Sequence, residues 1–320
     1  MNNIIMNRTA FIEHQKLRIE LPLFFPSISS VKTNFRPIDY LKFIEASNCP
    51  NFLISAFDIF NQNEPDQSIM IGILNKMKKE GRLILLDSGN YESYWHRDNS
   101  WSLDEYNEIL ENDFCSFCFS FDYQNIEEIN KDELTEIVTE NAIASQAVTQ
   151  GTIAPIVHAK WEDLEYVSCK VVQNLNPKFI AIPERLLGSG IITRVKKLRQ
   201  IRVSLNELGY YTPIHLLGTG NPFSILLFTY AGADTFDGLE WCQTCIDEKT
   251  LQVYHFQLRE LFDDGNGAKT LKNYEILTLL KNIQVYQSIN KLIQTGTNTN
   301  DMIDIMKTYF SERVIQKLQL

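Results

Sequence analysis

Short apolar segments alternate with amphipathic segments along most of the chain. Most of the apolar segments are rich in Ile, Leu and Phe, as expected of strands that are buried on both faces. Between most of them, apolar residues recur at i, i+3 and i+4, which predicts helices, for example over 102–112, 131–148 and 190–209. The predicted strands are 21–25, 52–57, 82–87, 116–122, 152–158, 179–184, 213–218 and 233–238.

This alternation predicts the α/β class, with a parallel sheet that is buried on both faces. Eight strands favour a closed (β/α)8 TIM barrel over an open doubly wound sheet. No Gly-x-Gly-x-x-Gly motif follows the early strands, so the main sign of a dinucleotide-binding fold is missing. We therefore expect a TIM barrel.

The last part of the chain has a different pattern. Segments 270–294 and 301–319 both show helical apolar spacing, and the polar linker 295–300 joins them. The predicted domains are a (β/α)8 barrel over 1–245 and a C-terminal helical extension over 246–320. The extension is expected to act as a cap or as a dimerisation element.

Composition and charge restrict the partners and the compartment. With 44% hydrophobic and 22% charged residues, the chain is typical of a globular protein. It has no 18-residue apolar run and no signal-peptide pattern at its start, so we expect a cytoplasmic protein without a membrane partner. The net charge of −10 repels nucleic acid on average. A nucleic-acid partner needs a local basic patch, for which 194–202 and 76–82 are candidates unless they are solvated helix faces.

Ionisable residues follow several of the predicted strands. In a TIM barrel the chemistry takes place at the carboxyl ends of the strands. A single Asp at such a place is often only a helix N-cap, but five ionisable groups at five strand ends predict a functional site. These strand ends carry Asp87, Asp122, His158, Glu184 and Asp237, and Gly218 ends a further strand.

Five short motifs around these residues resemble those of the tRNA-guanine transglycosylase family, in the same order and at similar spacing. The family motifs read roughly Asp-Ser-Gly-Gly-Phe/Tyr-Gln, Phe-Asp, Ile-Val-Gln-Gly, Met-Gly-x-Gly-x-Pro and Gly-x-Asp-x-Phe-Asp. The similarity extends over about 20–241 and is most specific near its end. The matching segments are DSGNYE (87–92), SFDY (120–123), PIVHA (155–159), HLLGTGNP (215–222) and GADTFDG (232–238).

The resemblance implies a role for each matching residue. Asp237 matches the nucleophile that attacks the anomeric carbon of a nucleoside, as the carboxylate of a retaining glycosidase does. Asp87 matches the residue that handles protons on the base, and Tyr91 matches the aromatic residue that stacks on the purine. Asp122 matches the carboxylate that accepts hydrogen bonds from guanine, and Gly218 matches the glycine against which the base lies.

The chain also departs from the family pattern. His158 stands where the family has glutamine, and Asn90 replaces a glycine. Segment 182–190 stands where the family has a Gly-Gly-Leu segment, so Glu184 or Arg185 is expected to contact the carbonyl or 7-substituent of the base instead. The predicted base pocket is therefore related to that of the family but different.

The zinc motif of the family is not reproduced. Cys242, Cys245 and His255 are three possible ligands, whereas a structural zinc site normally has four. The alternative is a pair of partly buried cysteines. We expect no metal and no cofactor.

Two functions are compatible with these residues. The first is an enzyme that exchanges guanine for a guanine or 7-deazaguanine base in tRNA or DNA through a covalent Asp-glycosyl intermediate. The second is a non-catalytic, deazaguanine-binding or dimerisation subunit of an anti-phage defence system. In both cases we expect a homodimer that uses the helices of 246–320.

Overall fold

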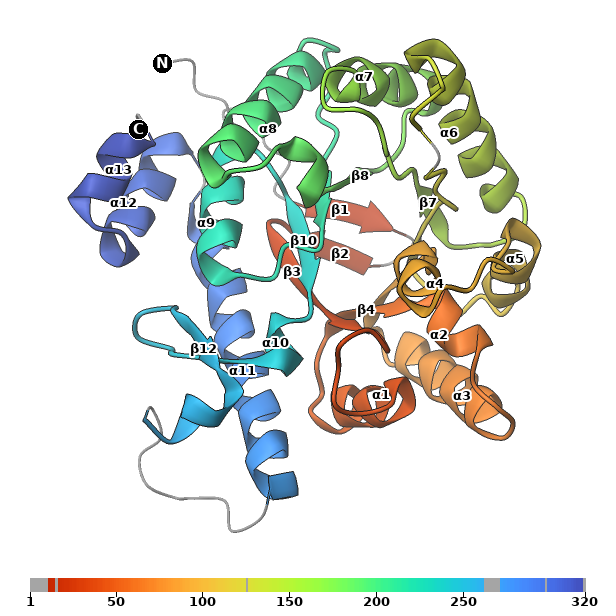
Figure 1. Ribbon diagram of the computed structural model, residues 1–320, viewed down its shortest axis with the longest axis horizontal. Helices are drawn as coiled ribbons and strands as arrows, with labels where there is room; N and C mark the ends of the chain where they lie inside the picture. The colour runs from red at the N-terminus through yellow and green to blue at the C-terminus, as the bar shows by residue number, and fades with distance from the viewer. Residues whose placement is uncertain (1–10, 15–16, 125, 262–270, 297, 319–320) are drawn as a thin grey trace.

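The computed structural model describes residues 11–14, 17–124, 126–261, 271–296 and 298–318, with a nearly closed barrel of eight parallel strands at the centre (Figure 1). The strands are hydrogen-bonded in the order β7-β6-β5-β4-β3-β10-β9-β8, and a bridge between Ile156 and Ala181 links the two ends of the sheet. The predicted α/β barrel is confirmed. Its strands are β3 (Leu23–Ile28), β4 (Asn51–Ser55), β5 (Leu83–Asp87), β6 (Phe117–Phe119), β7 (Thr152–Ala154), β8 (Ile180–Pro183), β9 (Ile214–Leu217) and β10 (Thr235–Gly238).

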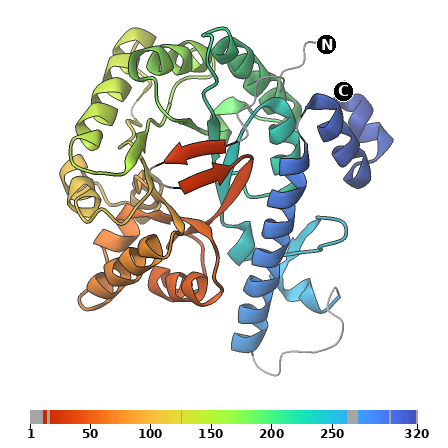
Figure 2. The same ribbon diagram turned by 180° about the vertical axis from the view of Figure 1, so that it is seen from behind.

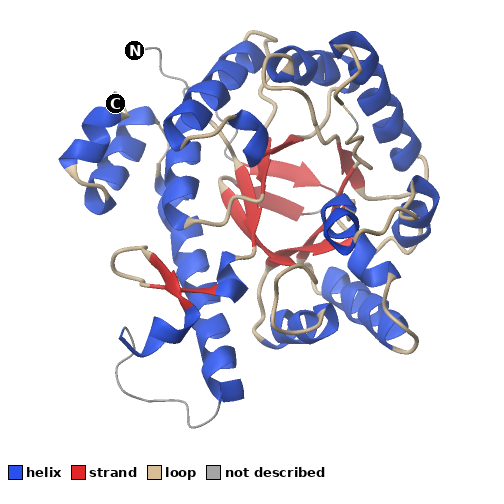
Figure 3. Ribbon diagram, viewed as in Figure 1, coloured by secondary structure: helices blue, strands red, loops and turns tan. Residues whose placement is uncertain are grey.

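Helices surround the strands and cover the apolar outer face of the barrel (Figure 3). Local caps define where several of them begin: the Asn130 side chain accepts two backbone N–H groups at the start of α6, and Asn221 does the same for α9. The helices up to β10 are α1 (Pro37–Ala46), α2 (Ala56–Phe60), α3 (Asp66–Lys79), α4 (Asn90–His96), α5 (Leu103–Leu110), α6 (Lys131–Gln146), α7 (Leu164–Leu175), η1 (Glu184–Leu187), α8 (Ile191–Asn206) and α9 (Pro222–Ala231).

An antiparallel hairpin of β1 (Phe11–His14) and β2 (Leu17–Glu20) crosses the amino-terminal end of the barrel (Figure 2). Its inward residues Ile12 and Ile19 belong to the same apolar cluster as Phe25 and Leu53 inside the barrel. The hairpin therefore covers the end of the barrel opposite the carboxyl ends of the strands.

The part of the chain after β10 packs on the barrel through its long helix. Tyr286 of α11 (Leu271–Thr295) stacks on Phe24 of β3 with 4.0 Å between ring centroids, and Asn290 Oδ1 accepts the Phe24 N–H at 2.8 Å. Helix α11 thus lies beside the first barrel strand. The preceding elements are α10 (Glu240–Gln243), β11 (Thr244–Ile246), β12 (Val253–His255) and η2 (Phe256–Leu261).

The second predicted helix of this region, 301–319, is wrong as a single helix. The structure divides it into α12 (Thr299–Tyr309) and α13 (Glu312–Lys317), because Phe310 leaves the helical conformation with φ −106° and ψ 141°. Residue 297 of the predicted linker lies outside the described residues, and so do Thr270 and Gln319 at the ends of the two predicted segments. The predicted boundary at residue 245 falls within β11.

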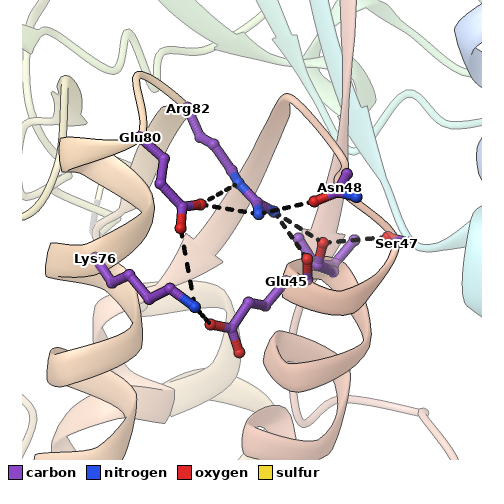
Figure 4. Close-up of polar contacts among 7 residues, drawn as sticks. Glu45, Ser47, Asn48, Lys76, Glu80 and Arg82 are labelled. Carbon is purple, nitrogen blue, oxygen red and sulfur yellow. Dashed lines mark hydrogen bonds and ion pairs between the residues drawn. The ribbon is translucent and has the colours of Figure 1, made fainter.

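A polar network joins the ends of α1 and α3 just before β5 begins (Figure 4). The Arg82 guanidinium donates to the Ile44 and Glu45 carbonyls at the end of α1, and it pairs with Glu80 at 3.0 Å. Lys76 pairs with Glu45 at 2.8 Å. Both carbonyls also accept backbone N–H groups that follow the helix, so Arg82 adds a further hydrogen bond to each of them. Lys76 and Arg82 of the predicted basic segment 76–82 are therefore engaged within the protein.

None of the helices in the described ranges is long and apolar enough to cross a membrane.

Candidate functional site

One cavity of about 440 Å³ opens at the carboxyl ends of the strands, a size in the range of about 300–1,000 Å³ that is typical of small-molecule sites. The barrel brings together residues that are far apart in the sequence, because the carboxyl ends of all its strands meet at one mouth. All the predicted site residues line this cavity: Asp87, Tyr91, Asp122, His158, Glu184, Arg185, Gly218 and Asp237.

Asp237 is held at the base of the cavity by three hydrogen bonds. Its Oδ1 accepts the Gly218 N–H at 2.9 Å, and its Oδ2 accepts the Ser27 hydroxyl at 2.8 Å. The third bond comes from His215, whose Nε2 lies 3.1 Å from Oδ1. The alternation along β10 turns Phe236 into the core and Asp237 into the barrel mouth. These bonds fix the carboxylate while leaving it in contact with the cavity.

Gly238, which follows Asp237, permits a close approach of two strand ends. A Cβ atom at this position would lie 2.5 Å from the Cα of Gly220, in the loop after β9. Glycine is therefore required for the backbones to meet here. The same approach places Gly218, with φ +75°, so that its N–H points at the Asp237 carboxylate.

His215 is a site residue that sequence reasoning missed. A histidine within a buried strand is usually part of the core, and the ring is fully buried. However, Nδ1 lies 2.9 Å from the Thr235 hydroxyl while Nε2 contacts Asp237. If Nε2 carries the proton, it donates to the carboxylate and Nδ1 accepts from Thr235. The only sequence signal was that the predicted strands of His215 and Asp237 follow one another in the chain.

Asp122 lies in a set of hydrogen-bond donors. Its Oδ1 accepts the Ser88 hydroxyl at 2.8 Å and Asn90 Nδ2 at 2.6 Å, and its Oδ2 accepts Gln124 Nε2 at 3.1 Å. Burial alone would raise the pKa of Asp122, but the nearby His158 ring and the bonds from Asn90 and Ser88 outweigh it and lower the pKa. Asp122 is therefore ionised at neutral pH.

His158 faces Asp122 across the cavity without a direct hydrogen bond. Its Nδ1 lies 3.6 Å from Asp122 Oδ2, and this buried atom has no hydrogen-bond partner among the described residues. Buried polar atoms normally have a partner, so this nitrogen is positioned for a polar group of a ligand.

Asp87 has the opposite electrostatic environment. Burial raises its pKa well above the ordinary value, and the negative charges of Glu92, Asp122 and Asp237 raise it further. Within the described part of the chain, the backbone N–H of Gly89 donates to it at 3.1 Å. These effects favour the protonated form of Asp87, which suits a carboxyl group that exchanges a proton with a ligand.

Two buried acids behind Asp87 were not singled out from the sequence. Glu92 on α4 accepts the Ser29 hydroxyl at 2.5 Å and the Ser55 hydroxyl at 2.9 Å. Burial raises the pKa of Glu92 to about 8, with a further contribution from the charge of Asp58. Burial also raises the pKa of Asp58 to about 7. No periodicity or spacing reveals such shifts, because they depend on how deeply the side chains are buried.

Glu240 is a further acid of the cavity that was not predicted. Its carboxyl group lies over Gly220, where a Cβ atom would be only 1.7 Å from Glu240 Oε2. Burial raises the pKa of Glu240 to about 7, and the charges of Asp237 and Glu184 add to this effect. The group is thus close to half-protonated at neutral pH beside Asp237.

Glu184 and Arg185 differ in their availability to a ligand. Glu184 Oε1 pairs with Arg194 Nη1 at 2.6 Å, and Oε2 accepts the Thr219 hydroxyl at 2.8 Å. Arg185 is exposed at the cavity wall and makes no ion pair with any described residue. Of the two predicted base contacts, Arg185 is the one with free hydrogen-bond donors.

An aromatic group borders the cavity on α4. Tyr91 is 38% exposed and packs edge-on against Trp95, with 6.3 Å between ring centroids. Gly89 at the start of this helix has φ +85°, and a Cβ atom there would lie 2.5 Å from the Phe57 Cβ. The Asp-Ser-Gly sequence thus turns tightly enough to bring Tyr91 to the cavity.

The three possible zinc ligands do not converge. Cys242 and Cys245 are buried, whereas His255 is exposed on β12, opposite Thr244. Within the described ranges, no group of three or more His, Cys, Asp or Glu side chains is arranged to hold a metal ion. The Cys242 thiol donates to the Leu239 carbonyl at 3.2 Å, and burial raises its pKa.

Comparison with known proteins gives one informative relative. No family model matches the sequence. The chain is 28% identical over 288 residues to a tRNA-guanine(15) transglycosylase of Nanoarchaeum equitans (strain Kin4-M). The match covers 82% of this chain and 64% of the relative, so the chain spans a little under two thirds of the length of that protein.

Proposed function

We propose that this chain, a divergent member of the tRNA-guanine transglycosylase superfamily, exchanges a guanine in a polynucleotide for a free guanine or 7-deazaguanine base. The observation that carries the proposal is the Asp237 carboxylate. Three donors hold it at the base of a cavity of suitable size, and Asp87, whose pKa is raised, lines the same cavity. A fixed carboxylate and a protonated one in a single cavity are the two groups that glycosyl transfer requires.

In the first step, an Asp237 oxygen forms a bond to the anomeric carbon of the nucleotide. The bond from that carbon to N9 of guanine breaks, and its electron pair goes to the base. Asp87 gives its proton to the departing guanine, which leaves as a neutral molecule. The products are a covalent glycosyl-Asp237 and an ionised Asp87.

In the second step, the incoming base takes the place of guanine. Its N9 forms a bond to the anomeric carbon while the bond to Asp237 breaks, and the electron pair returns to the carboxylate. The N9 proton of the incoming base passes to Asp87, which recovers its starting state. The hydrogen bonds from Ser27, His215 and Gly218 favour the ionised leaving carboxylate.

The base is expected to stack on Tyr91 and to give hydrogen bonds to Asp122. A carboxylate has about four lone-pair sites, and three of those of Asp122 are used by Ser88, Asn90 and Gln124. A base that donates two hydrogen bonds must therefore displace one of them, and Gln124, with the longest bond, is the first candidate. The free Nδ1 of His158 would meet the base carbonyl, in place of the glutamine of the family.

Several finer points belong to the proposal. The relative is named for tRNA, and for this chain either tRNA or DNA is a possible substrate. A homodimer through α11 is supported by three of its apolar residues, Ile276, Leu277 and Leu280, which are 36–38% exposed. The free base is the small-molecule partner, and we expect the protein to act in the cytoplasm.

The test is to trap the covalent intermediate. Wild-type protein incubated with a polynucleotide and no free base should give an adduct that survives a denaturing gel. Asp237→Asn keeps the shape and removes the nucleophilic charge, so it should abolish the adduct while free-base binding changes by less than roughly tenfold. Asp87→Asn is the comparison variant, because it removes the transferable proton and should slow adduct formation without removing the nucleophile.

Wild-type protein that binds deazaguanine but gives no adduct with tRNA, total RNA or DNA would contradict base exchange. It would favour the non-catalytic, deazaguanine-binding subunit instead. An adduct that still forms with Asp237→Asn would show that another residue is the nucleophile.

A further inference from the structure

A groove beside the cavity is not used by the exchange reaction. It lies between the segment after β7 and the start of α8, and its wall includes Trp161, Gly188 and Thr193. Arg185 and Arg194 line both the groove and the cavity, so the two adjoin one another. A ligand in the cavity therefore lies next to the groove.

Trp161 presents a fixed aromatic surface in this groove. Its indole N–H donates to the Leu187 carbonyl at 3.2 Å, and the Lys197 ammonium lies 4.5 Å from the ring centroid. The edge and one face of the ring are thus held by the protein, yet the residue remains 47% exposed. An ordered indole with an open face is suited to stacking against another flat ring.

Glu127 and Glu162 also line the groove, but the wall that it shares with the cavity carries a cation that suits a phosphate. Arg194 is neutralised by Glu184, and Lys160 donates to the Glu127 carbonyl at 2.5 Å. Arg185 makes no hydrogen bond or ion pair with the described residues, and it stands on the wall that the cavity and groove share. A guanidinium with free donors is well suited to phosphate.

We propose that Trp161 and Arg185 form a second subsite, in which the nucleobase adjoining the reacting nucleotide stacks on Trp161 and the phosphate between the two nucleotides contacts Arg185. This inference rests on the proposed function and specifies its substrate class. The substrate is a single-stranded or looped polynucleotide with a base next to the reacting guanine, and a mononucleoside is a poor substitute. Stacking on an aromatic side chain accepts any base, so the subsite contributes affinity without reading sequence.

The test uses short single-stranded RNA and DNA oligonucleotides that contain one guanine. The Asp237→Asn background prevents reaction, so binding is measured alone. Trp161→Ala should weaken oligonucleotide binding by roughly 5- to 150-fold, as expected for loss of one stacked base, and leave the binding of free 7-deazaguanine unchanged. Trp161→Phe should recover most of the loss. The control is Tyr210→Ala, an exposed aromatic residue beyond the carboxyl end of α8, which should change binding by less than about twofold.

The second arm removes the partner base rather than the tryptophan. Two oligonucleotides are used, with an abasic site on the 5′ or on the 3′ side of the guanine. One of them should bind more weakly to the protein that retains Trp161. On that oligonucleotide, Trp161→Ala should cause no further loss of affinity. The slope of log affinity against log salt concentration reports how many phosphates the protein contacts. Arg185→Ala should reduce this slope by the amount expected for about one phosphate contact.

The outcomes separate this inference from the proposed function. Suppose that wild type forms the adduct and that Trp161→Ala, like the control Tyr210→Ala, leaves the affinity for every oligonucleotide nearly unchanged. The subsite is then wrong, and base exchange stands. If the loss persists unchanged on both abasic oligonucleotides, Trp161 stacks on no neighbouring base and the subsite is again wrong. If oligonucleotide binding depends on Trp161 and on the neighbouring base but no adduct forms, the subsite is supported and the chemistry fails. Wild type without affinity for any oligonucleotide overturns the subsite as well.

Discussion

Replacing Glu92 by glutamine should change how the stability of the protein depends on pH. The Glu92 carboxyl is buried between the Ser29 and Ser55 hydroxyls, and its pKa is raised from the ordinary 4.5 to about 8. The folded protein therefore holds a proton on Glu92 that the unfolded chain has already lost. This contribution to stability is fully present below pH 4.5 and is lost as the pH rises towards about 8. Glutamine keeps the shape of the protonated acid and does not titrate.

The magnitude follows from the linkage relation. One proton held by the folded state and absent from the unfolded state lowers the free energy of unfolding by about 1.4 kcal/mol per pH unit. The advantage of Glu92→Gln over wild type should therefore grow by about 3 kcal/mol between pH 5.5 and 7.5. Above a pH of about 9 it should become constant, because Glu92 is then ionised in both states.

Urea denaturation followed by circular dichroism at several pH values measures this difference. The control is Glu111→Gln at an exposed position after α5, where we expect less than about 0.5 kcal/mol at each pH. Titration of Glu240 takes place in both proteins and largely cancels in the comparison, whereas Asp58 and Asp87 interact with Glu92, so the measured difference reports these three acids together. A Glu92→Gln advantage that is the same at pH 5.5 and 7.5 would refute the reasoning, since it would mean that Glu92 is ionised in the fold at both values.

Two further predictions concern base recognition and the C-terminal region. Asp122→Ala should weaken binding of free 7-deazaguanine by about 2–3 kcal/mol, because a buried edge of the base loses a charged acceptor. Calorimetry measures this affinity, and an unchanged value would mean that Asp122 does not contact the base. Tyr286→Ala should lower the free energy of unfolding by about 3–5 kcal/mol, because the buried ring stacks on Phe24 and its hydroxyl donates to the Gly220 carbonyl at 2.5 Å. A loss below about 1 kcal/mol would mean that α11 contributes little to the barrel.

Much of the site could be predicted because a parallel barrel maps sequence position onto position in space. Residues at the carboxyl ends of the strands must meet at one mouth, wherever they lie in the chain. Once the apolar runs were identified, Asp87, Asp122, His158 and Asp237 were expected to share a cavity, and they do. The family motifs added chemical roles to these positions, and those roles stay proposals.

The helices after the barrel were predicted less well, for a physical reason. Apolar spacing over 301–319 suits one helix, but it does not encode where tertiary contacts interrupt a helix. Phe310 packs against Phe223 of α9, with 5.0 Å between ring centroids, and the backbone turns at that residue. The packing of Tyr286 on Phe24 likewise joins residues that are far apart in the chain, so no local pattern contains it.

The sequence by itself determined the strand positions, the alternation that turns Asp237 towards the mouth, and the set of residues at the strand ends. These properties follow from local apolar periods and from the geometry of parallel strands. Only the tertiary structure decided that His215 holds Asp237 and that burial raises the pKa values of Glu92 and Glu240. It also decided that Glu184 is paired while Arg185 has no ion pair with any residue that the structure describes. Hydrogen bonds and pKa values depend on distances and burial between segments remote in sequence, and these exist only once the barrel has closed.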